Sequence, residues 1–535
     1  MFNRRKKIIA LALAATMCIG ILTGCSTKRT NSGNINEITW MGYPTNSSSQ
    51  EGTFPEQLLE NKFGVDIKPY FLPYGNYNDK KTMMISGGEI PDLIYEMDPM
   101  YVSADVSQNV LCEISYETIK KYCPTIYKQI TENAPSAWLY SYVDGKNYGI
   151  PNLNFLNAKT KIGMWREDWL KNVGIDKVPE TIDEMYVALQ KFTKEDPDKN
   201  GKNDTYGMTG TITSWNLMFT DIFGAYGVIP FNWVKDKNGN VVYGGFEEGT
   251  YQALETLNKW YSEGLIHPDF ILDSPSTTGK EKFLNGVVGY MNQNGGYFAP
   301  DDKSSIPNVA KSINSNAQIA LSSPVKGPDG DAGTHTWGLP CHIISFGKQL
   351  EDQPEKLHKI LEMLEAMVSD EEFMLELKLG EKGKHWDLAD PNGTISDGVK
   401  FLPPFDDVTQ RTNECINDTF NGPTFFMPVA PTYQQYEKYF NKNQVAVYEK
   451  YCSDVTAYTD VFMKPDVLPS ASKYFEDIKT VQINLMVKAI KGEITISEYK
   501  KEFAKSWKKM GGEQLETEAA TMFKTLNKIL KEVGA

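Results

Sequence analysis

The 535-residue sequence contains few of the motifs on which common enzyme chemistry depends. It has only five histidines, and no two of them have the three- or four-residue spacing that places metal ligands on one helix face. The motifs G-x-S-x-G, H-E-x-x-H, G-x-x-x-x-G-K-[ST] and G-x-G-x-x-G are all absent. The sequence therefore gives no support to the serine hydrolases, zinc peptidases, P-loop nucleotidases and dinucleotide-dependent oxidoreductases that use them.

Cysteine is scarce as well. Cys18 and Cys25 lie near the amino terminus, and the other five cysteines have irregular spacing and no C-x-x-C pair: Cys112, Cys123, Cys341, Cys415 and Cys452. An odd number without regular spacing argues against a disulfide framework and against a zinc site. We predict buried free thiols, with a bridge between Cys112 and Cys123 as the alternative.

Basic residues are outnumbered by acids, and the formal net charge is −14. Residues 1–24 carry four cations and no acid, so the rest of the chain has 51 cations against 69 acids, a formal charge of −18. Nucleic-acid binding requires basic patches that neutralise phosphate groups. We therefore expect no nucleic-acid partner.

The first 24 residues have the order of a secretory signal peptide. A basic block at residues 4–7 precedes residues 8–24, which carry no charge and are mainly apolar. This run of about 17 residues is close to the ~17–25 needed to span a bilayer, so a membrane helix remains the alternative.

Cys25 directly follows Leu22-Thr23-Gly24. This arrangement resembles the lipobox of bacterial lipoproteins, in which the signal is cut before the cysteine and the sulfur carries a diacylglycerol with chains such as palmitate. The resemblance implies lipidation at Cys25 and a membrane anchor, because two or more acyl chains make attachment stable. The polar residues that follow predict a flexible tether, so that residues 25–36 form the lipidated cysteine and its linker.

The remaining chain reads as a large α/β body. Hydrophobic residues make up 41% of the sequence and aromatics 12%, which suffices for a core divided over two or three lobes. Residues 37–43 and 63–73 are predicted strands, residues 79–86 a helix, and residues 93–95 a short buried strand. The order strand, helix, strand is typical of an α/β lobe.

Two further local patterns are clear. Thr181 and Glu184 have capping-box spacing, and an apolar stripe follows, so residues 182–192 are predicted to form a core-facing amphipathic helix. Residues 234–245 carry Asn238-Gly239 between alternating residues, which predicts a β-hairpin.

Residues 196–204, DPDKNGKND, have the ligand pattern of an EF-hand calcium loop. Oxygen donors fall at alternate positions, the fourth of them a backbone carbonyl: Asp196, Asp198, Asn200, Lys202 and Asp204. The twelfth position, normally a bidentate glutamate, is Gly207. We expect a structural Ca²⁺ ion here, and an Asn-Gly surface turn is the alternative.

Five stretches together carry a resemblance to a known family. They follow one another along nearly the whole chain after the signal segment: MMISGGEIPDLI (83–94), WREDWLKNVGIDKVPETIDEM (165–185), DPDKNGKNDTYGMTG (196–210), FLNGVVGYMNQNGGYF (283–298) and IKGEITISEYKKEFAKSWKKMGG (490–512). In these stretches the sequence resembles the extracellular solute-binding proteins of bacterial carbohydrate ABC transporters, a family that includes Gram-positive lipoproteins and alginate-binding proteins.

The resemblance implies an α/β, two-lobed periplasmic-binding-protein-like fold of class II type, with a hinge and a central ligand cleft that closes on the ligand. By analogy, lobe one is expected at residues 37–155 plus 338–395, and lobe two at residues 156–337 plus 396–535. The alginate-binding relatives carry Ca²⁺ in a loop like that at 196–204.

Sugar capture needs flat aromatic platforms for apolar C–H faces, and polar side chains for hydroxyl groups. Tyr297 and Phe298 match by position the aromatic pair that stacks on sugar in the maltose-binding relatives. Phe425 and Phe426 fall where the family places another stacking residue. The expected ligand-binding residues are Tyr297, Phe298, Asn294, Trp337, Phe425, Phe426, Trp40, Tyr43, Trp215 and Trp233. For each aromatic, ordinary core packing is the alternative.

We therefore expect a binding protein and no enzyme. The resemblance implies a monomeric, lipid-anchored substrate-binding component of an ABC importer, at the extracellular face of the cytoplasmic membrane of a Gram-positive-type bacterium. A Gram-negative periplasm is the alternative compartment, because a lipobox fits both. The protein would capture a sugar or oligosaccharide by hinge closure and deliver it to a membrane permease. Two alternatives stay open: a binding protein for peptides or other small solutes, and a surface glycoside hydrolase, whose carboxylate pair sequence cannot place.

Overall fold

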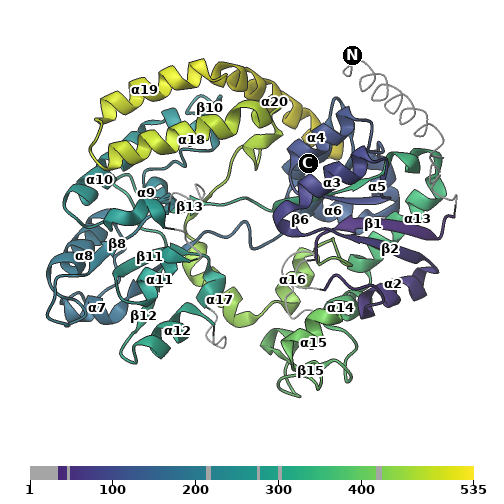
Figure 1. Ribbon diagram of the computed structural model, residues 1–535, viewed down its shortest axis with the longest axis horizontal. Coiled ribbons are helices and arrows are strands. Elements are labelled where there is room, and N and C mark those ends of the chain that lie inside the picture. Colours follow the sequence, from purple (N-terminus) through teal and green to yellow (C-terminus); the bar gives the residue numbers. More distant parts are fainter. Residues whose placement is uncertain (1–33, 45–47, 212–217, 274–276, 299–303, 417–423) are drawn as a thin grey trace, which may run out of the picture.

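The computed structural model describes residues 34–44, 48–211, 218–273, 277–298, 304–416 and 424–535. Figure 1 shows two lobes side by side, each built around a sheet with helices packed outside it, and the long helix α20 (Gly512–Val533) above both. Within these described ranges, no helix is both long enough and apolar enough to cross a membrane. Cys25 and the predicted signal peptide lie outside them.

The first lobe contains a five-stranded sheet in the order β2-β1-β3-β14-β6. Its strands are β1 (Glu37–Gly42), β2 (Asp66–Phe71), β3 (Leu93–Glu96), β6 (Gly149–Leu153) and β14 (Pro340–Phe346). β1 is parallel to β2 and β3, whereas β14 is antiparallel to β3 and β6. The three strands predicted from the first hundred residues are confirmed.

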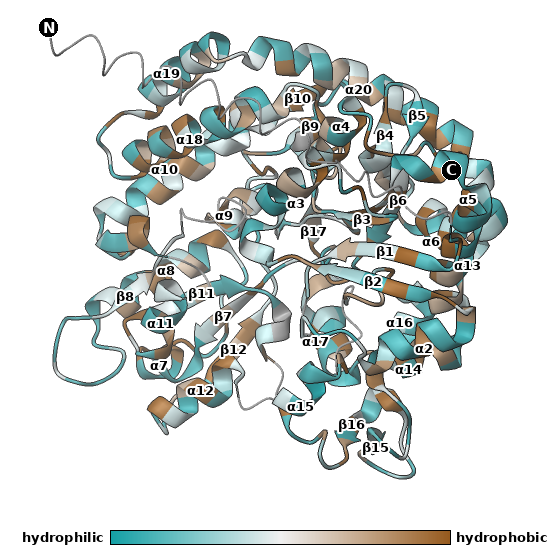
Figure 2. Ribbon diagram, turned by 45° about the vertical axis from the view of Figure 1, so that its right-hand side comes forward, coloured by the Kyte–Doolittle hydropathy of each residue, from teal (hydrophilic) through white to brown (hydrophobic). Residues whose placement is uncertain are grey.

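Helices of the first lobe pack around this sheet. They are α2 (Phe54–Phe63), α3 (Tyr77–Ser86), α4 (Pro99–Ser107), α5 (Tyr116–Tyr122), α6 (Pro124–Asn133), α13 (Pro354–Ser369) and α14 (Glu371–Leu379). In Figure 2 the peripheral helices alternate hydrophilic and hydrophobic residues along their length, which is the pattern of a helix with one face on a core.

An ion triad is buried between three elements of this lobe. The Lys81 Nζ atom of α3 lies 2.5 Å from Glu96 Oε2 at the end of β3, and 2.8 Å from Asp105 Oδ2 of α4. The Lys81 and Glu96 side chains are almost wholly excluded from solvent, and Asp105 is 7% exposed. The triad therefore joins α3 and α4 to the carboxyl end of β3, the central strand of the sheet.

The second lobe contains a four-stranded sheet in the order β12-β7-β11-β8. Its strands are β7 (Ile162–Arg166), β8 (Tyr206–Met208), β11 (Val288–Gln293) and β12 (Ile319–Ser322). β11 is antiparallel to β7 and parallel to β8. The helices around it are α7 (Glu167–Asn172), α8 (Ile182–Lys194), α9 (Thr220–Ala225), α10 (Glu248–Ser262), α11 (Thr278–Leu284) and α12 (Ile306–Ile313).

The two local predictions in this lobe are confirmed. At the start of α8, Thr181 Oγ1 accepts a hydrogen bond from Glu184 N at 3.2 Å, and the Glu184 carboxylate accepts one from Thr181 N at 3.2 Å. The apolar face of α8 is buried, as predicted from the apolar stripe in the sequence. The strands β9 (Trp233–Lys235) and β10 (Val241–Tyr243) pair as an antiparallel hairpin.

The lobes are joined by segments that lie close together. Residues 154–161 lead from β6 into β7, and residues 336–339 lead from β13 (Gly333–His335) into β14. Lys161 fastens the first segment to β13, where the second segment begins, because its backbone N–H donates to Thr334 Oγ1 at 2.9 Å and its ammonium donates to the carbonyl oxygen of His335 at 2.9 Å. Burial lowers the pKa of Lys161 to about 8.

Residues 396–416 and 424–440 pack on the first lobe. Ser48 N donates to the carbonyl oxygen of Thr412 at 2.9 Å, and Gln435 Nε2 donates to the carbonyl oxygen of Val368 at 2.8 Å. These residues include β16 (Val399–Phe401), α15 (Val408–Asn413) and α16 (Tyr433–Tyr439). These contacts associate the residues just after 395 with the first lobe, whereas the sequence-based boundary assigned them to lobe two.

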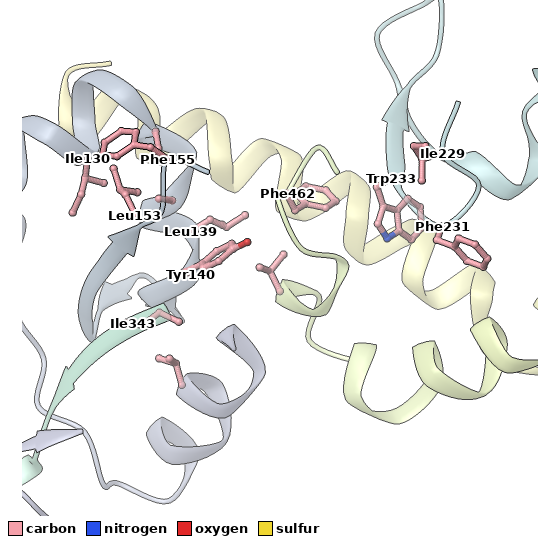
Figure 3. Packing of buried hydrophobic residues seen from close by; sticks show 14 of the residues in the cluster. Ile130, Leu139, Tyr140, Leu153, Phe155, Ile229, Phe231, Trp233, Ile343 and Phe462 are labelled. Atoms are coloured by element: carbon pink, nitrogen blue, oxygen red, sulfur yellow. The ribbon is translucent and has the colours of Figure 1, made fainter. Parts of the chain in front are cut away.

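The chain then returns to the second lobe through α17 (Lys442–Cys452) and β17 (Thr456–Tyr458), which pairs with β13. Buried hydrophobic residues continue from one lobe to the other, and Figure 3 shows Phe462 between Leu139 and Tyr140 on one side and Trp233 on the other. The chain ends with α18 (Ala471–Ile490), α19 (Ile496–Lys509) and α20.

Helix α20 contacts both lobes. At the second lobe it packs against α19 and β10, and Lys235 Nζ of β9 lies 4.9 Å from the centre of the Phe523 ring. At the first lobe it packs against the 3₁₀ helix η2 (Pro135–Ser141), and the Tyr127 hydroxyl donates to the carbonyl oxygen of Val533 at 3.1 Å. The two lobes are therefore connected by this helix as well as by the crossing segments.

Cys112, Cys123, Cys341 and Cys415 are buried free thiols, and Cys452 is a partly buried one. The prediction of free thiols is confirmed for these five residues. The bridge between Cys112 and Cys123 is not formed: each sulfur donates to a different carbonyl oxygen, that of Glu113 and that of Leu361.

Candidate functional site

The carboxyl ends of four strands of the first sheet lie at one edge, together with the amino end of β14, because β14 runs antiparallel to its neighbours. Polar and aromatic residues lie at this edge: Tyr43, Tyr74, Asp98 and Asn154 come within three residues of a strand's carboxyl end, and His342 is the third residue of β14. Ligands of open α/β sheets bind outside the carboxyl ends of the strands. This edge is therefore the first place to look for a binding site.

A cleft of about 730 Å³ opens at this edge. Trp337 in the second crossing segment and residues 471–479 at the start of α18 also line it. The volume lies within the usual range of about 300–1,000 Å³ for small-molecule sites. The cleft is lined by the aromatic residues Tyr74, Tyr101, Trp337 and Phe475 and by the polar residues Asp98, Asn154, Asn157, His342, Lys464, Ser472, Glu476 and Lys479.

Two aromatic side chains offer ring surface to the cleft. Tyr74 is 69% exposed, and its ring packs edge-on against Tyr43 with a centroid distance of 5.0 Å. Trp337 is partly exposed and meets His335 edge-on at 4.8 Å. Exposed rings held by neighbouring rings are suited to stacking on an apolar ligand face.

The charged groups of the cleft are paired with one another. Lys464, which follows β17, forms an ion pair with Asp98, which follows β3. Lys479 Nζ lies 2.6 Å from Glu476 Oε1 on α18. Burial, and then the nearby Lys464 ammonium, lower the pKa of His342 to about 3, so this imidazole is neutral at physiological pH.

The second sheet also presents polar groups at one edge. The chain enters β7 from the first lobe, so the amino end of β7 marks the edge nearest that lobe. The carboxyl ends of β11 and β8 lie at this edge too, because β11 is antiparallel to β7 and parallel to β8. A small cavity of about 40 Å³ lies here, and its polar lining consists of Thr209, Thr211, Asp221, Tyr290 and Asn292. The Tyr290 hydroxyl donates to Asp221 Oδ2 at 2.5 Å. Burial raises the pKa of Asp221.

The predicted ligand-binding residues are divided between these edges and the cores. Trp337 lines the cleft, and Tyr43 is 9% exposed and supports Tyr74 from behind. Asn294 and Tyr297 are exposed beyond β11, whereas Phe298 packs partly buried on the core of the second lobe. Trp215 lies outside the described residues.

Four predicted aromatics present no face to a ligand in this structure. Trp40 points into the first lobe and stacks on Phe425 at 6.1 Å, and Phe426 packs against both. Trp233 is fully buried beside Trp507 and Tyr243. These four residues pack in the core, which was the stated alternative to ligand binding for each of them.

Several cleft residues were not predicted, notably Tyr74, Asp98 and Lys464. A signal for the first two was present in the sequence: Tyr74 follows the strand predicted at 63–73, and Asp98 stands three residues after the strand predicted at 93–95. The rule that ligands bind beyond strand ends would have selected both. Lys464 has no such signal, because it reaches the cleft from the segment that follows β17.

The loop at 196–204 folds around its own acids. The Asp196 carboxylate accepts hydrogen bonds from Asn200 N at 3.1 Å and Gly201 N at 3.0 Å, and Asn200 Nδ2 donates to Asp198 at 2.8 Å and Asp204 at 3.1 Å. Burial, and then the neighbouring acids, raise the pKa of Asp198. Oxygen donors of the type that Ca²⁺ prefers are therefore gathered in one loop.

The same loop lacks its last calcium ligand for a steric reason. Gly207 lies in β8, and a Cβ atom added there would approach Leu189 to 2.7 Å, so no glutamate fits at this position. In the described part of the chain, no three histidine, cysteine or acidic side chains are close enough to form a metal-binding group. The oxygen donors at 196–204 are of the kind that calcium binds, but the loop has fewer of them than a complete EF-hand loop because the glutamate is missing.

Comparison with known proteins identifies the family. The model of the family "Bacterial extracellular solute-binding protein" matches residues 46–343, more than half of the chain. The chain belongs to this family. Lipoprotein LipO of Bacillus subtilis is 31% identical over 401 residues, which cover 72% of this chain and 74% of LipO. The relationship predicted from the five sequence stretches is confirmed.

Two further relatives extend the comparison. The polygalacturonan/rhamnogalacturonan-binding protein YtcQ of Bacillus subtilis is 21% identical over 97% of this chain and 98% of its own. The structure of the substrate-binding protein FusA of Streptococcus pneumoniae in complex with kestose has a TM-score of 0.66 and 18% identity, and covers 92% of this chain and 99% of that one. This solute-binding protein therefore has the two-lobed fold predicted from its sequence.

Proposed function

We propose that this solute-binding protein captures a sugar or oligosaccharide in the cleft between its lobes and delivers it to the permease of an ABC importer. The observation that carries the proposal is the cleft itself, where exposed rings of Tyr74 and Trp337 stand beside side-chain amides and an ion pair. Rings and polar groups in one cleft suit the apolar faces and hydroxyl rim of a sugar. The name of YtcQ refers to an acidic saccharide and that of FusA to a neutral one, so these names do not indicate whether the ligand of this protein is charged.

The mechanism of such a protein is a shift between open and closed populations. A ligand that touches both lobes stabilises the closed form by its difference in affinity for the two states. Periplasmic binding proteins close by hinge rotation. In this chain the crossing segments, the first of which Lys161 fastens to β13, are suited to the role of hinge, and Trp337 connects that hinge to the ligand.

We further propose that the protein is a monomer anchored to the outer face of the cytoplasmic membrane through a diacylglycerol on Cys25. The support is the lipobox-like sequence and the relative LipO, whose name describes a lipoprotein. The glycoside-hydrolase alternative gains no support from the described cleft lining, where the carboxylates of Asp98 and Glu476 each lie in an ion pair with a lysine.

Ligand binding is expected to compact the protein and to raise its melting temperature. The mature chain carrying Cys25→Ser would be screened by thermal shift against oligosaccharides, amino acids and peptides, followed by small-angle scattering with each ligand found. A ligand at 100 times its Kd adds about 2.7 kcal/mol to the free energy of unfolding. Binding without a smaller radius of gyration would contradict closure, and stabilisation by peptides alone would contradict the sugar assignment.

We propose that the loop at 196–204 binds a structural Ca²⁺ ion through Asp196, Asp198, Asn200, the Lys202 carbonyl and Asp204. A FusA structure carries an EF-hand mutation, which supports such a loop in this fold. Added Ca²⁺ is expected to raise the melting temperature by a few degrees, reversibly with chelator, because the ion neutralises crowded carboxylates.

The matched control for calcium uses two loops. Asp198→Asn should abolish the calcium response, whereas Asp236→Asn in the hairpin loop should leave it unchanged, although Asp236 also accepts hydrogen bonds from its own loop. A calcium response that survives Asp198→Asn would place the ion elsewhere.

A further inference from the structure

The cations that line the interlobe cleft have little capacity left for a charged ligand. An ammonium group has three N–H donors. Lys464 directs its ammonium toward the Asp98 carboxylate and toward two carbonyl oxygens, those of Met97 at 3.4 Å and Cys341 at 3.5 Å. Its charge is therefore compensated within the protein, and a carboxylate on a ligand would have to displace Asp98.

Lys479 is compensated in a similar way. Its ammonium lies 2.6 Å from Glu476 and 5.4 Å from the centre of the Phe475 ring, and only 11% of its side chain is exposed. Glu476 is 75% exposed, so the outer part of this pair presents an acid. The remaining basic residue of the cleft lining, His342, is neutral, since its pKa is lowered to about 3.

The small cavity at the edge of the second sheet presents a carboxylate as well. Asp221 is 2% exposed and already accepts the Tyr290 hydroxyl at 2.5 Å. The Thr211 hydroxyl oxygen is buried and has no hydrogen-bond partner among the described residues. A cavity of about 40 Å³ has room for a hydroxyl group, which both donates and accepts, whereas a ligand carboxylate would meet the oxygens of Asp221.

We infer that this protein selects an uncharged, hydroxyl-rich oligosaccharide and discriminates against saccharides that carry uronate carboxylates. The inference rests on the proposed function and adds the charge class of the ligand. A ligand carboxylate near Asp98 is repelled, because the two lysines of the described cleft lining are already paired with acids. At the dielectric response typical of protein surfaces, one such contact lowers affinity by roughly tenfold or more.

The test compares saccharides that differ only in charge. The mature chain carrying Cys25→Ser would be titrated by calorimetry with kestose, fructo-nystose, and neutral trisaccharides paired with their uronate forms, such as galactotriose with trigalacturonate. Neutral members are expected to bind with an affinity that salt leaves unchanged. Each uronate form should bind at least about tenfold more weakly, most of all in low salt, where repulsion is least screened.

The outcomes separate this inference from the proposed function. A uronate form that binds as tightly as its neutral counterpart, or more tightly, overturns the inference and leaves the proposed function intact. Binding of peptides only, or of none of these compounds, overturns both.

A variant pair tests whether Asp98 is the source of the discrimination. Asp98→Asn removes the partner of Lys464, so the ratio of neutral to acidic affinity is expected to fall by about tenfold. The control Asp66→Asn removes an exposed acid 2.7 Å from Lys68, away from the cleft, and should leave the ratio unchanged. An unchanged ratio in Asp98→Asn, or an equal change in both variants, contradicts the inference.

Folding of Asp98→Asn would be checked by its melting curve. If that variant does not fold, Glu476→Gln provides the same comparison through Lys479, because the exposed position of Glu476 makes the substitution structurally mild. The ratio is expected to move in the same direction, and no movement in a folded Glu476→Gln protein contradicts the inference.

Discussion

Replacing Trp337 by alanine is expected to weaken ligand binding by about thirtyfold to several hundredfold. Trp337 lines the cleft with an aromatic ring from the crossing segment 336–339, together with the polar residues of the first lobe's edge. Truncation of a central aromatic in a binding site commonly costs about 2–4 kcal/mol, and each 1.4 kcal/mol is tenfold in affinity. The measurement is calorimetric titration with the saccharide found in the thermal-shift screen.

Two further variants distinguish a stacking role from a structural one. Trp337→Phe retains a ring and should recover most of the lost affinity. Tyr433→Ala removes an aromatic that is 37% exposed on α16, outside the cleft lining, and should bind as the unmodified protein does. Equal affinities for Trp337→Ala and the unmodified protein would show that the ligand does not stack on this ring.

Lys81→Met is expected to lower the free energy of unfolding by about 3–5 kcal/mol. The substitution leaves two buried carboxylates, Glu96 and Asp105, without the ammonium that lies 2.5 and 2.8 Å from them. Breaking a buried ion pair by removing one partner has this magnitude because an uncompensated buried charge remains. Urea-induced unfolding measures the change.

The control for this variant is the neighbouring residue on the same helix. Lys80 is exposed on α3, so Lys80→Met should change the free energy of unfolding by no more than about 0.5 kcal/mol. If Lys81→Met were equally mild, the triad would contribute nothing to stability. Adding Glu96→Gln to Lys81→Met should restore part of the loss, since one of the two buried charges is then removed.

The loss should also depend on pH. Burial raises the pKa of Glu96 from 4.5 to about 8, although Lys81 opposes the shift. A carboxyl whose folded pKa exceeds its unfolded pKa holds its proton longer in the folded state, so its contribution to stability falls as pH rises from about 4.5 to 8. Without Lys81 the pKa rises further. The deficit of Lys81→Met is therefore expected to be smaller at pH 5 than at pH 8.

Much of the fold could be predicted because its signals are local. The capping box at Thr181, the Asn238-Gly239 turn and the alternation in the first strands each depend on residues a few positions apart, and each has the expected structure. The lobe assignment of residues 396–416 and 424–440 could not be obtained in this way. It depends on contacts such as that between Ser48 and Thr412, which are distant in sequence.

The candidate site was harder to predict for a related reason. An aromatic that stacks on a ligand and one that stacks on another aromatic have the same local sequence. Trp40 is buried because its strand position faces the core and Phe425 covers it, whereas Tyr74 is exposed because it is the third residue after the end of β2. The distinction is set by the packing of segments more than 300 residues apart, which no local pattern contains.

Helix α20 has a consequence for the mechanics of the molecule. Its first turns are held on the second lobe and its last residue is hydrogen-bonded to Tyr127 on the first, over a length of about 33 Å at 1.5 Å per residue. A lobe rotation that changes the separation of these two attachments has to bend the helix or shift one of its interfaces. Helix α20 thus acts as an elastic restraint on such a rotation.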